Sequence, residues 1–175
     1  MTTVATHAAG LPAHRQRDAA LFALVAMVAT VGGALALQHL GGYIPCKLCL
    51  EQRTPYYIGI PLMALAFLSA SFRLPAVIAR VLLLAGGLLM AWGFYLGVYH
   101  AGVEWAWWPG PTDCGAVSGS VDTGGKGVLD ALNAVVPPSC DQAALRIFGL
   151  SLAGWNAIAT LVIGGVAFWG AAQKA

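Results

Sequence analysis

Apolar segments alternate with shorter polar ones along the whole chain. Four segments contain no Asp, Glu, Lys or Arg over roughly 20 residues, the length that a helix needs to cross the hydrocarbon core of a membrane. They are residues 19–40, 54–72, 81–101 and 147–172. None shows the alternation of a membrane β-strand, and a backbone in lipid must satisfy its own hydrogen bonds. The pattern therefore predicts an all-α protein, a single membrane bundle of four helices.

The composition supports this interpretation. Of the 175 residues 59% are hydrophobic and only 9% are charged, and the mean hydropathy is +0.75, which excludes an ordinary soluble domain. The net charge is only +2 and the basic residues are scattered. This distribution gives no basis for a nucleic-acid partner, whereas the lipid bilayer is an obvious one.

The charged residues predict an orientation. With four spans, both termini and the turn at 71–80 share one side, which holds Arg15, Arg17, Arg73, Arg80 and Lys174. By the positive-inside rule this side is cytoplasmic. The other side holds all four cysteines and six of the seven acids. Cysteines confined to the outer, oxidising side favour disulfide chemistry.

The segments outside the spans have separate predictions. Residues 1–18 are expected to be a loose cytoplasmic tail. The first apolar segment is as long as a full span and has no small-residue cleavage site before the cysteines, so we expect it to stay as an anchor. The outer loops are 41–53 and 102–146. Within the second loop, apolar residues at helical spacing in 128–136 predict either a short amphipathic helix on the membrane surface or an ordinary packed loop helix.

Prolines and glycines predict local features of the spans. Pro55 fits the first turn of the second helix or a slightly later kink, and Pro61 should bend that helix. Gly93 and Gly97 are four residues apart in the third span. Small residues at this spacing let a neighbouring helix approach closely.

Cys46 and Cys49 form a Cys-x-x-Cys motif, whose spacing serves haem attachment, zinc binding and dithiol redox chemistry. Haem attachment needs a histidine directly after the second cysteine, where this chain has Leu50. Structural zinc would favour a second closely spaced pair, but Cys114 and Cys140 are 26 positions apart. The motif stands beside basic residues and near the expected start of the second helix, which stabilise a thiolate. Redox chemistry is therefore the favoured function.

Arg53 follows Cys49 by four residues, so that both are expected on one face of the helix at the lipid boundary. An arginine there is most often an anchor at the membrane surface, but its pairing with the cysteines favours a functional role. No haem, flavin or iron–sulfur motif is present to receive electrons from the dithiol. By elimination we predict a lipid-soluble quinone, whose carbonyl oxygen accepts a hydrogen bond from Arg53.

His100 falls near the outer end of the third span, at the expected depth of a quinone head group, where it would supply or orient a proton. A haem held by His39 and His100 is a less favoured alternative. Trp105 and Trp108 are expected in the aromatic belt, with lining of the pocket mouth as the other reading.

The sequence "PCKLCLEQR" at 45–53, the four spans and a second cysteine pair between the third and fourth spans together resemble the bacterial disulfide bond formation protein B (DsbB) family. The resemblance covers nearly the whole chain. It implies a membrane thiol:quinone oxidoreductase that sustains disulfide formation in the periplasm.

The resemblance also implies residue roles. A reduced periplasmic thioredoxin-fold oxidase of the DsbA type would attack Cys114, and Cys140 would resolve or exchange with Cys46. Cys49 would hand the electron pair to ubiquinone or menaquinone next to Arg53, and the respiratory chain would reoxidise the quinol. The long tail and the tryptophan-rich approach to Cys114 depart from the family pattern and leave the choice of partner open.

Two other classes remain. In one, the outer cysteines form disulfides that only brace the loops of a non-enzymatic membrane protein. In the other, the chain is a zinc-binding or haem-binding membrane protein.

Overall fold

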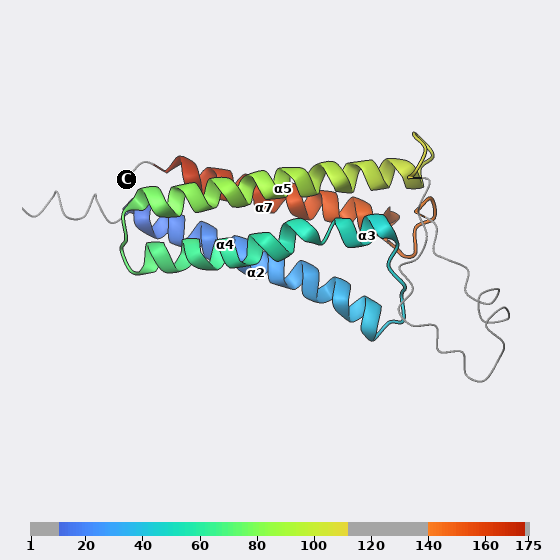
Figure 1. Ribbon diagram of the computed structural model, residues 1–175, viewed down its shortest axis with the longest axis horizontal. Coiled ribbons are helices and arrows are strands. Elements are labelled where there is room, and N and C mark those ends of the chain that lie inside the picture. Colours follow the sequence, from blue (N-terminus) through green and yellow to red (C-terminus); the bar gives the residue numbers. More distant parts are fainter. Residues whose placement is uncertain (1–10, 112–139, 174–175) are drawn as a thin grey trace, which may run out of the picture.

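Four long helices lie side by side in the computed structural model, which describes residues 11–111 and 140–173 (Figure 1). They are α2 (Leu11–His39), α4 (Thr54–Ser71), α5 (Ala76–Glu104) and α7 (Leu152–Ala172). A short helix α3 (Lys47–Glu51) directly precedes α4. Four helices, with α3 and α4 counted as one span over Lys47–Ser71, are long and apolar enough to cross a membrane. The predicted all-α four-helix membrane bundle is confirmed.

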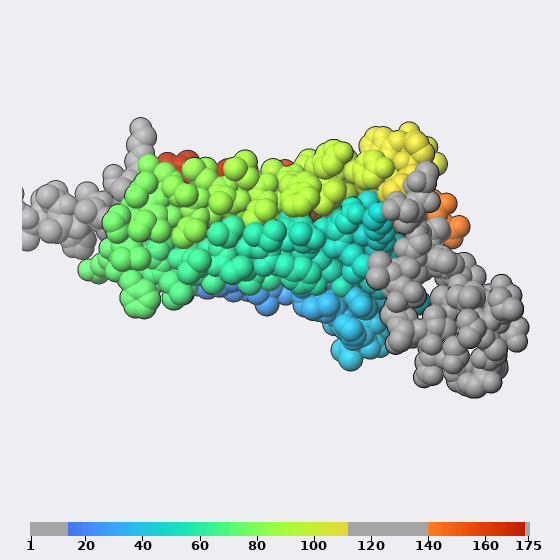
Figure 2. Space-filling view, in the orientation of Figure 1, coloured from blue at the N-terminus to red at the C-terminus, as the bar shows by residue number. Residues whose placement is uncertain are grey.

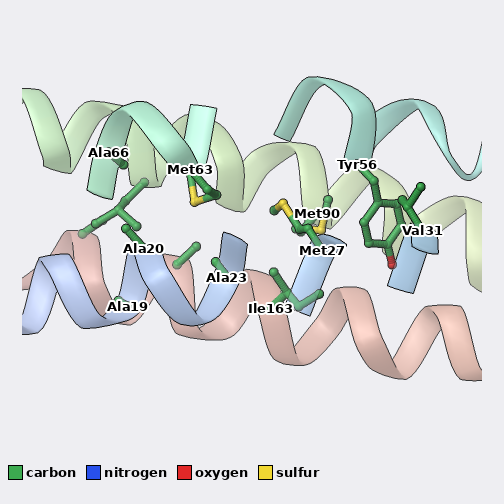
Figure 3. Close-up of a cluster of buried hydrophobic side chains, with 13 residues drawn as sticks. Ala19, Ala20, Ala23, Met27, Val31, Tyr56, Met63, Ala66, Met90 and Ile163 are labelled. Carbon is green, nitrogen blue, oxygen red and sulfur yellow. The ribbon is translucent and has the colours of Figure 1, made fainter. Parts of the chain in front are cut away.

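Small and flexible side chains fill the interior of the bundle. Alanines of α2 allow the helix to approach its neighbours closely, and three methionines fill the remaining gaps (Figure 3). The fully buried members of this core are Ala20, Ala23, Met27, Met63, Ala66, Leu83, Met90 and Ala167. Large apolar side chains instead point outward, as expected for lipid-facing surfaces, and Figure 2 shows the face that α4 and α5 form together.

Helices α5 and α7 approach each other closely at Gly97. A Cβ atom on this glycine would lie 3.0 Å from the Cα atom of Ala157, and one on Gly93 would lie 3.0 Å from Cγ2 of Thr160. At Gly97 a side chain would press on the backbone of α7, whereas at Gly93 it would press on the Thr160 side chain. The predicted role of the two glycines in close helix contact is confirmed.

Helices α2 and α5 begin before the predicted spans, at Leu11 and at Ala76, because a helix continues beyond the residues that lie in lipid. α2 begins at Leu11, so the expectation of a loose chain is wrong for residues 11–18. Gln16 in this first part is only 1% exposed, and its side-chain nitrogen donates to the carbonyl oxygen of Gln173 at 3.4 Å. Residues 1–10 lie outside the described part.

The start of the fourth helix also differs from the prediction. Arg146–Ile147 (β1) and Leu150–Ser151 (β2) form a two-stranded antiparallel hairpin, so the helix does not begin at residue 147. The turn requires positive φ at Gly149 (81°), which glycine adopts without strain. The Ser151 hydroxyl then caps α7 by accepting a hydrogen bond from the backbone N–H of Gly154 at 3.2 Å.

Pro55 lies in the first turn of α4, as predicted, and Pro61 lies inside the helix, which continues past it. The predicted amphipathic helix at 128–136 lies outside the described residues.

Candidate functional site

Cys46 and Cys49 lie together at one end of the bundle because a short helix begins between them. Cys46 is the N-cap of α3, and its sulfur accepts a hydrogen bond from the backbone N–H of Cys49 at 3.4 Å. The two Sγ atoms are 2.8 Å apart. The expectation that Cys49 stands at or just before the helix start is close to the structure, in which Cys49 lies in the first turn of α3.

The two cysteines differ in their surroundings. The hydrogen bond to Cys49 and burial raise the pKa of the Cys46 thiol to about 12, although the contact with His100 acts in the opposite direction. Cys46 is 5% exposed, whereas Cys49 is half-buried and lines a cavity. The raised pKa keeps the Cys46 thiol protonated at neutral pH.

Cys140, which is distant in sequence, belongs to the same cluster. It is 2% exposed and packs with Cys46, Leu48 and Val103, with Cys49 at the edge of the group. The fold thus brings three of the four predicted cysteines together. Cys114 lies outside the described residues.

His100 is 3% exposed and connects the dithiol to two side-chain amides, the buried Gln52 and the half-buried Asn156. Its Nε2 atom lies 3.7 Å from the Cys46 sulfur, and its Nδ1 atom lies 2.6 Å from Nε2 of Gln52. Both ring nitrogens therefore have polar neighbours, and the ring is held in one orientation.

A chain of hydrogen bonds extends from His100 to α7. The Tyr56 hydroxyl donates to Oδ1 of Asn156 at 2.6 Å, and Nδ2 of Asn156 donates to Oε1 of Gln52 at 2.7 Å. Sequence reasoning gave Gln52 no role and did not consider Asn156 in the site. The available signal was a polar amide within or beside an apolar span, where such groups are costly unless they are paired.

Glu104, one of the six acids predicted on the outer side, lies one turn after His100 on α5. Its side chain is 4% exposed, and its Oε1 atom lies 3.8 Å from Nε2 of His100. Among the described residues, its Oε2 atom has no hydrogen-bond partner. A buried carboxylate with an unsatisfied oxygen next to a dithiol is a functional signal.

A cavity of about 410 Å³ adjoins these groups. Apolar residues of α2 and α7 form most of its wall, and its polar wall contains Cys49, Gln52, Arg53, His100 and Asn156. Its volume falls within the range of about 300–1,000 Å³ that is usual for small-molecule sites. The tryptophan in its wall is Trp155; Trp105 and Trp108 are not among its lining residues.

Arg53 lines the same cavity as Cys49, as their spacing predicts. One guanidinium nitrogen, NH1, donates to Oε1 of Gln38 on α2 at 2.6 Å. This contact fixes the guanidinium at the junction of α2 and α4, and a guanidinium has further N–H groups to offer a ligand.

The two alternative sites, a haem site and a metal site, differ in the support that the structure gives them. His39 is exposed and does not line the cavity, so the structure gives no support to a haem held by His39 and His100. For a metal ion the case is stronger, because Sγ of Cys46, Sγ of Cys49 and a ring nitrogen of His100 all lie within 4.8 Å of one another. The third ligand of such a site is His100 of α5, and not a cysteine of a second pair.

Comparison with known proteins gives one result. Residues 16–170 match the model of the family described as Disulfide bond formation protein DsbB. No curated protein and no solved structure matches the chain significantly.

Proposed function

This chain belongs to the DsbB family of disulfide bond formation proteins, and we propose that it is a membrane thiol:quinone oxidoreductase. Its substrate is the reduced dithiol of a periplasmic thioredoxin-fold oxidase of the DsbA type. The observation that carries the proposal is the cluster of Cys46, Cys49 and Cys140 beside a cavity that Cys49 lines.

The cavity fits a quinone. Its wall is mostly apolar, as a ring with an isoprenoid tail requires, and it contains polar side chains that can form hydrogen bonds with a carbonyl oxygen. When bound, ubiquinone or menaquinone supplies an acceptor for two electrons and two protons. Arg53 would hold one carbonyl oxygen through a charged hydrogen bond, and His100 lies in the same wall.

The thiol chemistry uses the buried cluster. Cys140, as the thiolate, attacks Sγ of Cys46 in the Cys46–Cys49 disulfide, so that a Cys46–Cys140 bond forms and the bond to Cys49 breaks. Cys49 leaves as a thiolate in the cavity wall. Attack of the Cys114 thiolate on Cys140 would then re-form the Cys114–Cys140 disulfide and release Cys46, and the reduced pair would return to the Cys46–Cys49 disulfide by giving two electrons and two protons to the bound acceptor. The contact of His100 with Cys46 orients the sulfur under attack.

Exchange with the partner protein begins at Cys114, by analogy with the family. The partner's thiolate attacks Cys114, and Cys140 is released as the thiolate for the next step. This scheme places the cysteine end of the bundle on the periplasmic side and both termini in the cytoplasm.

A turnover assay tests the proposal. In the presence of a metal chelator, the purified chain, supplied with a reduced thioredoxin-fold dithiol and a soluble ubiquinone analogue, should reduce the quinone at a rate proportional to protein concentration. Cys49→Ser and Cys46→Ser should abolish turnover, and the control Glu51→Gln, a change on an exposed residue of α3, should retain it. Full turnover in Cys49→Ser would refute the mechanism. Cysteines that stay oxidised when quinone is removed would instead indicate structural disulfides.

A further inference from the structure

The dithiol site contains more ligand atoms than electron transfer requires. Two sulfurs and one imidazole nitrogen lie within 4.8 Å of one another, and a buried carboxylate oxygen is 3.8 Å from Nε2 of the same imidazole. Two thiolates, an imidazole and a carboxylate are ligands that Zn²⁺ prefers, and four is its usual coordination number.

The distance between Cys46 and His100 agrees with tetrahedral coordination. Zinc bonds of about 2.3 Å to sulfur and about 2.0 Å to nitrogen separate those two atoms by roughly 3.5 Å at a tetrahedral angle. Sγ of Cys46 and Nε2 of His100 are 3.7 Å apart. The two sulfurs, now 2.8 Å apart, would have to separate by about 1 Å to share a zinc ion. Cys49 is half-buried and lines the cavity, which gives its sulfur room for this movement.

Glu104 provides an independent observation. Its side chain is 4% exposed, and within the described part of the chain its Oε2 atom has no hydrogen-bond partner. Leaving a carboxylate oxygen buried and unsatisfied is costly. Glu104 is not part of the group whose ligand atoms lie within 4.8 Å of one another, so its carboxylate would have to turn toward a cation bound to the dithiol and His100. Binding that cation would remove the cost.

The outer contacts of the imidazole also fit. A histidine that binds a metal through Nε2 normally donates its other N–H to a fixed acceptor. The side-chain amide of Gln52 lies 2.6 Å from Nδ1 of His100. A half-turn of this amide, whose oxygen and nitrogen are nearly isosteric, presents its oxygen to Nδ1–H. The Asn156 amide, whose Nδ2 donates to Oε1 of Gln52 at 2.7 Å, would turn as well, so that its oxygen accepts from Gln52 and its Nδ2 donates to the Tyr56 hydroxyl.

We propose that the reduced site binds one Zn²⁺ through Cys46, Cys49 and His100, with Glu104 as the fourth ligand, and that the oxidised site does not. Binding converts two thiols into two zinc-bound thiolates and releases two protons to the buffer. A Cys46–Cys49 disulfide has no thiolate to offer, so the oxidation state of the pair controls metal binding. Zinc on the dithiol would also block its oxidation. The inference goes beyond the proposed function and needs only reduced cysteines.

Direct metal binding tests the inference. The full chain with Cys114→Ser and Cys140→Ser, which leaves Cys46 and Cys49 as its cysteines, is reduced with a phosphine and titrated with Zn²⁺ against a chromophoric chelator. The expected result is one Zn²⁺ per chain. After oxidation with diamide the affinity should fall at least tenfold. Equal binding in both states, or no binding in the reduced state, would overturn the proposal.

Single substitutions then assign the ligands. Cys46→Ser and His100→Gln should each weaken zinc binding by about 10–100-fold, and Glu104→Gln by about tenfold. His39→Gln and Glu51→Gln, the matched changes on exposed residues, should leave it unchanged. Unchanged affinity in His100→Gln, or in His100→Asn where the first variant does not elute as a folded monodisperse species, would contradict the ligand set.

Co²⁺ gives a second readout that does not depend on affinity. Bound in place of zinc, it should show the strong visible bands of tetrahedral coordination and the near-ultraviolet charge-transfer band of thiolate ligands. An octahedral spectrum in the reduced chain would overturn the proposed geometry. Because neither titration contains quinone or partner protein, and the turnover assay is run with a metal chelator, failure of one proposal is distinguishable from failure of the other.

Discussion

The two ends of the bundle have the same helices but very different interiors. At the end where α2 begins, the interior is filled by alanines, Met63 and Leu83, none of them more than 3% exposed. There Arg80 donates to the carbonyl oxygen of Gln173 at 2.8 Å and so holds the end of α7. At the other end the interior contains buried amides, an imidazole, a carboxylate and a 410 Å³ cavity.

The divergence of α2 accounts for part of this difference. Figure 1 shows α2 moving away from the other helices toward the end that carries α3. The separation leaves space between α2, α4 and α7, which is the cavity. Close packing at one end stabilises the bundle, whereas open packing at the other admits a ligand, so stability and chemistry should respond to different substitutions.

The largest expected effect is that of Cys140→Ser at the open end. Turnover with the protein dithiol should fall at least about 1,000-fold, because the sulfur that attacks Cys46 is lost. A small dithiol such as dithiothreitol, which can reach the inner pair directly, should still support quinone reduction. The control Gln142→Ala, on an exposed residue nearby, should turn over normally. Equal loss with both dithiols would show that Cys140 acts on folding and not on exchange.

The second-largest effect is expected for Arg53→Gln. Losing a charged donor at the site of developing negative charge should lower kcat/KM for quinone by about 100-fold. Exchange between the cysteines and a protein dithiol, followed by thiol trapping, should be unaffected. Arg146→Gln, an exposed arginine at the same end of the bundle, is the matched control. A similar loss in both variants would indicate a general charge effect.

Met27→Ala tests the packed interior. Met27 is 0% exposed, and truncating it should cost about 2–3 kcal/mol of folding free energy through lost packing. The KM for quinone should stay within about twofold of the parent value, because Met27 does not line the cavity. Unfolding in a denaturing detergent measures the first quantity, with Val28→Ala on the lipid-facing side, 50% exposed, as the control. A large change in KM without loss of stability would contradict the division between the two ends.

The smallest effect concerns pH. The pKa of Cys46 is raised from about 9, the value of an ordinary thiol, to about 12. Alkylation of Cys46 in the reduced chain should therefore accelerate only well above pH 9. The raised pKa favours the folded state at low pH, and this contribution is lost as the pH rises from about 9 toward 12. Cys49→Ala removes the largest cause, so Cys46 alkylation at pH 8 should become about tenfold faster or more. Mass spectrometry of the alkylated peptide gives the rates, and unchanged rates would argue against the Cys46–Cys49 hydrogen bond.

The sequence was sufficient for the architecture and for the dithiol, since charge-free segments and a Cys-x-x-Cys motif are local features. It was insufficient for helix ends outside lipid: α2 begins at Leu11 because a helix does not stop where hydropathy falls. It also missed the turn at Gly149 that delays α7 until the Ser151 cap.

Contacts between distant segments account for what else was missed. Gln52 meets His100 and Asn156 only because α5 and α7 stand in a particular register beside α4. That register is set by close contacts such as Gly97 against Ala157. The glycines could be recognised in the sequence, but the side chains that they bring together could not.

A single turnover without partner protein tests the central claim most directly. The fully reduced chain, with its metal removed by a chelator, is mixed with one equivalent of quinone in the absence of oxygen, and the quinol and the Cys46–Cys49 disulfide are quantified together. We expect one quinol for each disulfide formed. Quinone that remains oxidised, or quinol that appears while Cys46 and Cys49 stay reduced, would contradict the account.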